Sequence, residues 1–66
     1  MMQVSNTLIT SAENAARTLV RDGVHEMEIE DAKGFFISTH EELPEKAVHI
    51  ATIRVDQKEF IIFIRE

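Results

Sequence analysis

The sequence predicts an α+β fold, in which one N-terminal amphipathic helix packs on a three- or four-stranded antiparallel sheet built from two hairpins. Three observations predict it: apolar residues recur at helical spacing near the N-terminus, the apolar period changes to two after Gly23, and two turn sequences interrupt the later apolar runs. A chain of 66 residues is long enough to bury one hydrophobic core. We therefore expect residues 1–66 to form a single α+β domain.

The predicted helix carries one apolar stripe. Its members recur at helical spacing: Leu8, Ile9, Ala12, Ala15, Ala16, Leu19 and Val20. Arg17 and Arg21 lie in the later turns, where positive charge suits the helix dipole. Gly23 supplies the left-handed conformation that commonly ends a helix, so we expect the helix to end at Asp22.

The start of this helix is open between two positions. Thr10 and Glu13 have the capping-box spacing, which favours a start near residue 11. Ser5 or Asn6 can instead cap a helix that begins near residue 7. With the later start, residues 2–8 are free to form an additional strand.

The segment after the helix has the alternation of a half-buried strand. Two sets of side chains alternate in it: His25, Met27 and Ile29 on one face, and Glu26, Glu28 and Glu30 on the other. Asp31–Gly34 is a turn sequence, after which Phe35–Thr39 returns as the second strand. In the predicted register Ile29 lies opposite Ile37, and Phe36 points to the glutamate face.

A second hairpin is predicted after the acidic loop that runs from His40 to Lys46. Its strands are Ala47–Val55 and Lys58–Arg65, and positions 56 and 57 form a two-residue loop between them. This loop sets Arg54 opposite Glu59, which is a favourable cross-strand pair.

Both faces of the second hairpin are apolar in this register. One face carries Ala51, Ile53, Phe60, Ile62 and Ile64, and the other carries Val48, Ile50, Ile61 and Phe63. One helix can cover only one face, so the second face must be covered by something else. We expect a homodimer in which Val48, Ile50, Ile61 and Phe63 meet their twofold copies, with a different protein or closure into a small barrel as the alternatives.

The composition excludes several classes of protein. Hydrophobic residues make up 44% of the chain, as in folded proteins. The formal net charge is −5 and the basic residues are scattered along the sequence, so no direct nucleic-acid partner is expected. The absence of cysteine excludes disulfides and fits a cytoplasmic location. The longest apolar run, Phe60–Ile64, is too short to span a membrane, and the N-terminus does not resemble a signal peptide.

The three histidines are the natural starting point for a metal site. His25, His40 and His49 have neither the helical i,i+4 spacing nor an HxH spacing, so we interpret them as strand and loop residues. No metal and no cofactor are expected. The serines lack the context of a nucleophile, and no phosphate-binding loop occurs. We therefore do not expect an enzyme, and a metal-dependent enzyme is the most remote alternative.

The glutamate face of the first hairpin is the predicted site of partner binding. Glu26, Glu28 and Glu30 are about 6.6 to 6.8 Å apart at the rise of a strand, a spacing comparable with that of phosphates along a nucleic-acid strand. Phe36 lies beside them. Further acidic residues can extend the stripe: Asp31, Glu41, Glu42 and Glu45. The sharper hypothesis is an acidic mimic of nucleic acid, and the plainer one is a solvated face that discourages edge-to-edge association.

Residues 50–64 loosely resemble the second motif of the Sm-like RNA-binding family. Arg54 precedes a turn, an aliphatic strand follows it, and a helix before an antiparallel meander is similar to that family's fold. Val55 stands where the family has glycine, and its RNA-contacting pattern is missing. The resemblance implies a nucleic-acid-binding small barrel as an alternative, which would need a basic patch assembled by oligomerisation.

Taken together, these features favour a small non-catalytic protein that regulates or inhibits a partner protein by direct contact. Its size and style are those of proteins carried by phages and mobile elements. The acidic mimic is one version of this hypothesis.

Overall fold

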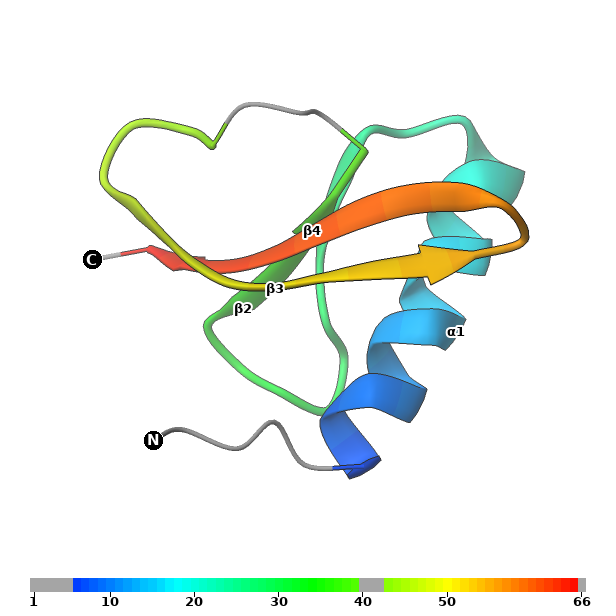
Figure 1. Ribbon diagram of the computed structural model, residues 1–66, viewed down its shortest axis with the longest axis horizontal. Coiled ribbons are helices and arrows are strands. Elements are labelled where there is room, and N and C mark those ends of the chain that lie inside the picture. The colour runs from blue at the N-terminus through cyan, green and yellow to red at the C-terminus, as the bar shows by residue number, and fades with distance from the viewer. Residues whose placement is uncertain (1–5, 40–42, 66) are drawn as a thin grey trace.

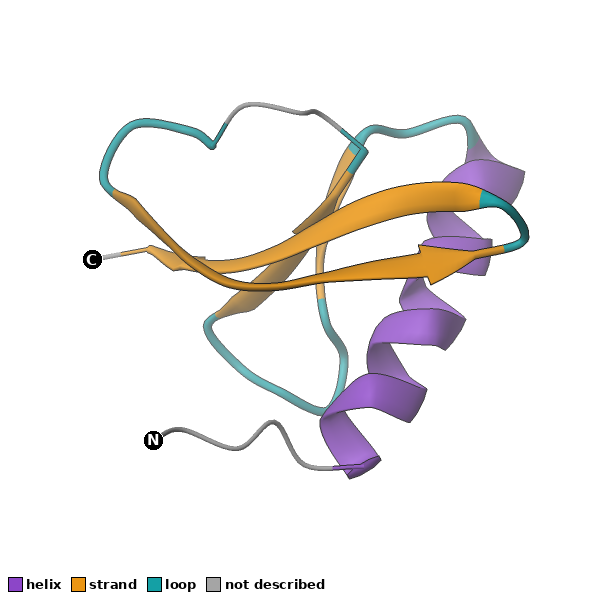
Figure 2. Ribbon diagram, viewed as in Figure 1, coloured by secondary structure: helices purple, strands orange, loops and turns teal. Residues whose placement is uncertain are grey.

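The fold consists of one helix on one antiparallel sheet. The protein is described here by a computed structural model, which covers residues 6–39 and 43–65. In chain order the elements are α1 (Asn6–Asp22), β1 (Glu26–Glu28), β2 (Phe35–Ser38), β3 (Ala47–Val55) and β4 (Lys58–Arg65) (Figure 1). The sheet has four strands in the order β1-β2-β4-β3, so the last strand of the chain lies inside it (Figure 2). This arrangement confirms the predicted α+β fold.

The N-terminal end of α1 lies at the earlier of the two predicted starts. The helix begins at Asn6, so Thr10 and Glu13 lie within it rather than at its cap. Residues 6–8 are helical, which contradicts the alternative strand over residues 2–8 in this part; residues 1–5 lie outside the described chain. The earlier start adds a turn in which Leu8 packs against the core.

The helix α1 ends at Asp22, as predicted, and its C-terminal end forms a Schellman motif. The amide of Gly23, which has a φ of 72°, donates to the carbonyl oxygen of Val20 over 3.2 Å. The amide of Val24 donates to the carbonyl oxygen of Leu19 over 3.1 Å. These two bonds satisfy carbonyl groups that a helix end leaves free. They also hold Val24 directly beside the last helical turn.

The first hairpin differs from the predicted one in its register. Met27, not Ile29, lies opposite Ile37. The connection is longer than the predicted turn, because Ile29 already belongs to it and its amide donates to the carbonyl oxygen of Phe35 over 2.8 Å. The register changes by two residues, so each side chain keeps its predicted face. Glu30 consequently lies beyond the end of β1.

The second hairpin has the predicted strand bounds and the predicted pair of Arg54 and Glu59. Its two loop residues, Asp56 and Gln57, both have positive φ, at 53° and 70°. Positive φ at both central positions defines a type I′ turn, whose twist matches that of the flanking strands.

Because of a β-bulge in β3, the two faces of this hairpin differ from the predicted ones. The register shifts between His49 and Ala51, so that Val48 lies opposite Ile64. A bulge inserts one extra residue and moves the preceding side chains to the other face. Val48 therefore joins the face of Ile64, and Ile50 packs against the core. The prediction that Val48, Ile50, Ile61 and Phe63 share one face is wrong.

The core lies between α1 and one side of the sheet. We call this side of the sheet the helix face and the opposite side the open face. The buried core residues come from α1, β2, β3, β4 and the loop after β1: Ala12, Ala15, Ala16, Leu19, Ile29, Ile37, Val55, Phe60 and Ile62. Three alanines on the buried side of α1 let the helix approach the strands closely. Among the described residues, no helix has both the length and the apolar character needed to cross a lipid bilayer.

Candidate functional site

The open face of the sheet is covered by its own side chains. Phe36 of β2 stacks on Phe63 of β4, with ring centroids 5.6 Å apart and ring planes inclined by 17°. The guanidinium of Arg65 lies 4.8 Å from the Phe36 centroid and 5.6 Å from that of Phe63. Arg65 Nη2 in turn donates to Glu26 Oε2 over 2.6 Å. Phe63 is fully buried within the single chain, so this face does not present the large apolar surface that motivated a dimer through it.

The three predicted partner-binding glutamates are not brought together as one free acidic stripe. Glu26 is paired with Arg65, and Glu28 Oε2 accepts a hydrogen bond from the amide of Gly34 over 2.8 Å. Glu30 lies in the loop after β1, where it lines a hollow of about 140 Å³ with residues of α1. Of the acidic residues proposed to extend the stripe, Glu41 and Glu42 lie outside the described residues.

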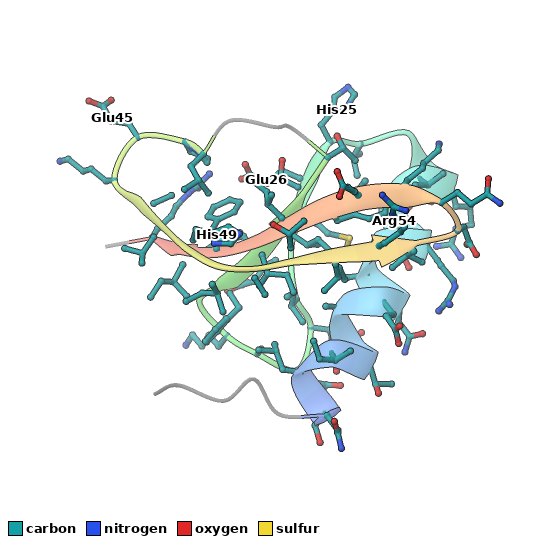
Figure 3. All side chains as sticks on the ribbon, viewed as in Figure 1. His25, Glu26, Glu45, His49 and Arg54 are labelled. Atoms are coloured by element: carbon teal, nitrogen blue, oxygen red, sulfur yellow. The ribbon has the colours of Figure 1, made fainter. Side chains whose placement is uncertain are left out.

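The histidines within the described chain have separate hydroxyl partners. His25 Nδ1 lies 3.3 Å from Thr39 Oγ1, and His49 Nε2 lies 2.9 Å from Thr52 Oγ1. Figure 3 shows His49 toward the left end of the sheet and His25 well apart from it, at the top of the view. Over residues 6–39 and 43–65, no group of three histidine, cysteine or carboxylate side chains is placed to hold a metal ion. His40 lies outside this part of the chain.

The C-terminal end of α1 lies beside the tip of the β3–β4 hairpin (Figure 1), and side chains of both elements line hollows there. Two hollows, of about 610 Å³ and about 310 Å³, lie on either side of Val20 and Lys58, which line both. We call this region the tip surface. Its residues are Arg17, Val20, Arg21, Val24, Arg54, Gln57, Lys58 and Glu59.

Two aliphatic side chains are exposed on the tip surface. Val20 is 45% exposed and Val24 is 44% exposed, more than any other large apolar residue of the described chain. Both line the larger hollow, with the buried Leu19 also at its wall. The Schellman motif explains the position of Val24, because its two hydrogen bonds hold this residue against the end of the helix. It leaves the outer half of each valine in water.

The fold gathers four of the seven basic residues on the tip surface, although they are scattered in sequence. Three of them have carboxylate partners: Arg17 with Asp56 at 3.8 Å, Arg21 with Asp22 at 3.1 Å, and Arg54 with Glu59 at 3.6 Å. Lys58 has no carboxylate within ion-pair distance among the described residues. Lys58 is therefore the cation of this surface whose charge a partner could neutralise.

Comparison with protein-family models, with curated proteins and with solved structures finds no match for this chain. The tip surface was not predicted from the sequence, because its residues come from two segments thirty or more positions apart. The sequence did contain one indication that part of this surface would be exposed. Val20 lies at the margin of the helical stripe, and Val24 follows the glycine that ends the helix, so neither position guarantees burial.

Proposed function

We propose that this protein is a small non-catalytic protein that regulates or inhibits another protein by direct contact, and that the tip surface makes this contact. The observation that supports the proposal is the exposure of Val20 and Val24 side by side in one hollow. Burying such side chains against a partner is favourable by about 25 cal/mol for each Å² of apolar surface removed from water. The lack of cysteine is compatible with a partner in the cytoplasm.

The charges of the tip surface indicate the chemistry of the partner. An aliphatic side chain can enter the hollow and contact Val20 and Val24, and a carboxylate next to it can pair with Lys58. Each of the three arginines has a carboxylate of the same chain beside it, so little net positive charge is left on this surface. A polyanion therefore gains little attraction here, whereas a single carboxylate beside an apolar group needs only Lys58. For this reason a protein partner is favoured over direct nucleic-acid binding.

The acidic-mimic version of this function draws less support from the geometry. A nucleic-acid mimic needs free carboxylates in a regular row, and both Glu26 and Glu28 are used inside the chain. Val20 and Val24 have no comparable internal use. The tip surface is therefore the surface to test first.

The test compares the proteins captured from host extract by the unmodified protein and by matched variants. Val20→Glu and Val24→Glu place a charge in the hollow, and Lys58→Glu reverses the free cation. Leu43→Glu is the control, because Leu43 is also a largely exposed aliphatic residue, at 39%, and lies outside the tip surface. We expect a partner that binds the unmodified protein and Leu43→Glu but is lost from the three tip variants. Equal capture by all the variants would contradict the proposal.

A further inference from the structure

We propose that the protein forms a symmetric homodimer through the outer edge of β3, in which Ala51–Val55 pairs with the same segment of a second copy about Ile53. The strand order leaves two edges in the described sheet, β1 and β3. β1 has only three residues, whereas β3 has nine. A long edge strand presents unpaired amide and carbonyl groups to any strand that can approach it.

The bulge divides β3 into two parts with different capacity for pairing. Between His49 and Ala51 the ladder is irregular, and such irregularity protects an edge from a further strand. From Ala51 to Val55 the pairing with β4 is regular. Only this second part of β3 offers an undistorted edge.

The turn between β3 and β4 determines which residues of Ala51–Val55 have backbone amide and carbonyl groups that point away from β4. Val55 and Lys58 flank the type I′ turn, so they exchange hydrogen bonds with each other. Hydrogen-bonded and non-hydrogen-bonded pairs alternate along an antiparallel ladder. The amide and carbonyl groups of Thr52 and Arg54 therefore point away from β4, toward the free edge.

These outward groups permit one undisturbed twofold register. Pairing Thr52 with its own copy would place Arg54 opposite Ile50, which lies in the bulge. Pairing Arg54 with its own copy would set two guanidinium groups directly against each other, which is unfavourable. Pairing Thr52 with Arg54 of the second copy avoids both problems. Its twofold axis passes beside Ile53, the central residue of the regular segment.

On both faces of the sheet, the side chains of Ala51–Val55 are compatible with the register that pairs Thr52 with Arg54 of the second copy. On the helix face, Ile53 lies opposite the buried Phe60 and is itself only partly covered, so the Ile53 residues of the two copies would bury each other. On the open face, Arg54 is already balanced by Glu59. β3 contains no acidic residue. The edge is therefore free of like-charge repulsion even though each chain has a net charge of −5.

A second copy fits this edge better than an unrelated strand, because the segment is complementary to itself. The proposed dimer does not rest on the tip surface, and it replaces the open-face dimer expected from Val48, Ile50, Ile61 and Phe63. Failure of one proposal is separable from failure of the other: Val20→Glu should still dimerise, and the Thr52 variants, at a position outside the tip surface, should still bind a partner through it. Arg54 lies in both surfaces, so Arg54→Glu is used only to test dimerisation.

The test is sedimentation velocity over a dilution series of the full chain. Thr52→Lys places a lysine opposite Arg54 of the second copy, twice in each dimer, and we expect it to weaken dimerisation by about tenfold or more. Thr52→Glu is the matched control, because it also loses the hydrogen bond to His49 but places a carboxylate opposite Arg54. It should dimerise at least as tightly as the unmodified protein.

A mixing experiment tests the register itself. An equimolar mixture of Thr52→Lys and Arg54→Glu should contain more dimer than either variant alone at the same total concentration, because the introduced lysine of one chain then faces the introduced glutamate of the other. Thermal melts of each variant check that the monomer remains folded. A monomer at every concentration of the unmodified protein would overturn the proposal, as would equal dimerisation of Thr52→Lys and Thr52→Glu.

Discussion

Single residues of this small protein divide sharply into those that hold the core and those that face water, and adjacent helical positions show the difference. Leu19 is fully buried among the residues of the helix face. Val20, the next residue, is largely exposed on the tip surface. A neighbour in sequence can therefore serve as the exposed control when burial is tested.

We expect Leu19→Ala to lower the free energy of unfolding by about 2 to 5 kcal/mol, because it removes buried apolar contacts and leaves a cavity. Val20→Ala should change it by less than about 0.5 kcal/mol, as is usual for exposed positions. Urea denaturation followed by circular dichroism measures both. Similar values for the two variants would mean that α1 does not pack on the sheet through Leu19.

At the scale of secondary-structure elements, the β3–β4 hairpin combines a favourable turn geometry with one unfavourable turn residue. Both central residues of a type I′ turn need positive φ, so glycine, asparagine and aspartate are preferred there. Asp56 fits this preference, but Gln57, with a φ of 70°, does not. Both have contacts on the tip surface: Asp56 pairs with Arg17, and Gln57 lines the larger hollow. The Gln57 side chain therefore contributes to the tip surface at a position where glycine would make the turn more stable.

Gln57→Gly should raise the free energy of unfolding by about 0.5 to 1 kcal/mol, since the relief of left-handed strain exceeds the added flexibility of the unfolded chain. Gln57→Ala keeps the strain and removes the same side chain, so it serves as the control and should not stabilise the protein. Thermal melts compare the two. If binding through the tip surface uses the Gln57 side chain, both variants should lose affinity equally, despite their different stabilities.

The elements could be predicted from the sequence where local signals were strong. The positive-φ stop at Gly23 determined the end of α1, and alternation with a two-residue loop determined both strands of the second hairpin. The bulge could not be predicted, because the segment from His49 to Ala51 contains no glycine or proline to signal it. That single irregularity changed the face of Val48 and, with it, the surface expected to make a dimer.

At the scale of the whole molecule, the candidate sites depend on contacts between distant parts of the chain. Among the described residues, one of the two side-chain pairs with the longest sequence separation joins Glu26 in the first hairpin to Arg65 near the end of β4. The guanidinium of Arg65 in this pair also lies over the stacked rings of Phe36 and Phe63. Charge counting along the sequence could not reveal this pair, and so the glutamate face was interpreted as a free acidic stripe.

We expect Arg65→Ala to lower the free energy of unfolding by about 1 to 2 kcal/mol, because it removes a cation–π contact and an ion pair that are both partly exposed. Arg65→Lys keeps the charge but not the planar group that lies over the rings, and should give an intermediate loss. A double-mutant cycle with Glu26→Gln isolates the ion pair. Additive effects in that cycle would show that Glu26 and Arg65 do not act together.

The inner position of β4 has a consequence for biosynthesis. β4 comes after the other described elements in the chain, yet it is the strand that pairs with both β2 and β3. Until β4 leaves the ribosome, β3 has no partner in the described sheet, and the apolar side of α1 has only the short first hairpin to cover it. Domains commonly fold as units during synthesis at about 5 to 20 residues per second. In this domain the sheet cannot close before β4 emerges, and the segments made earlier stay open to chaperones until then.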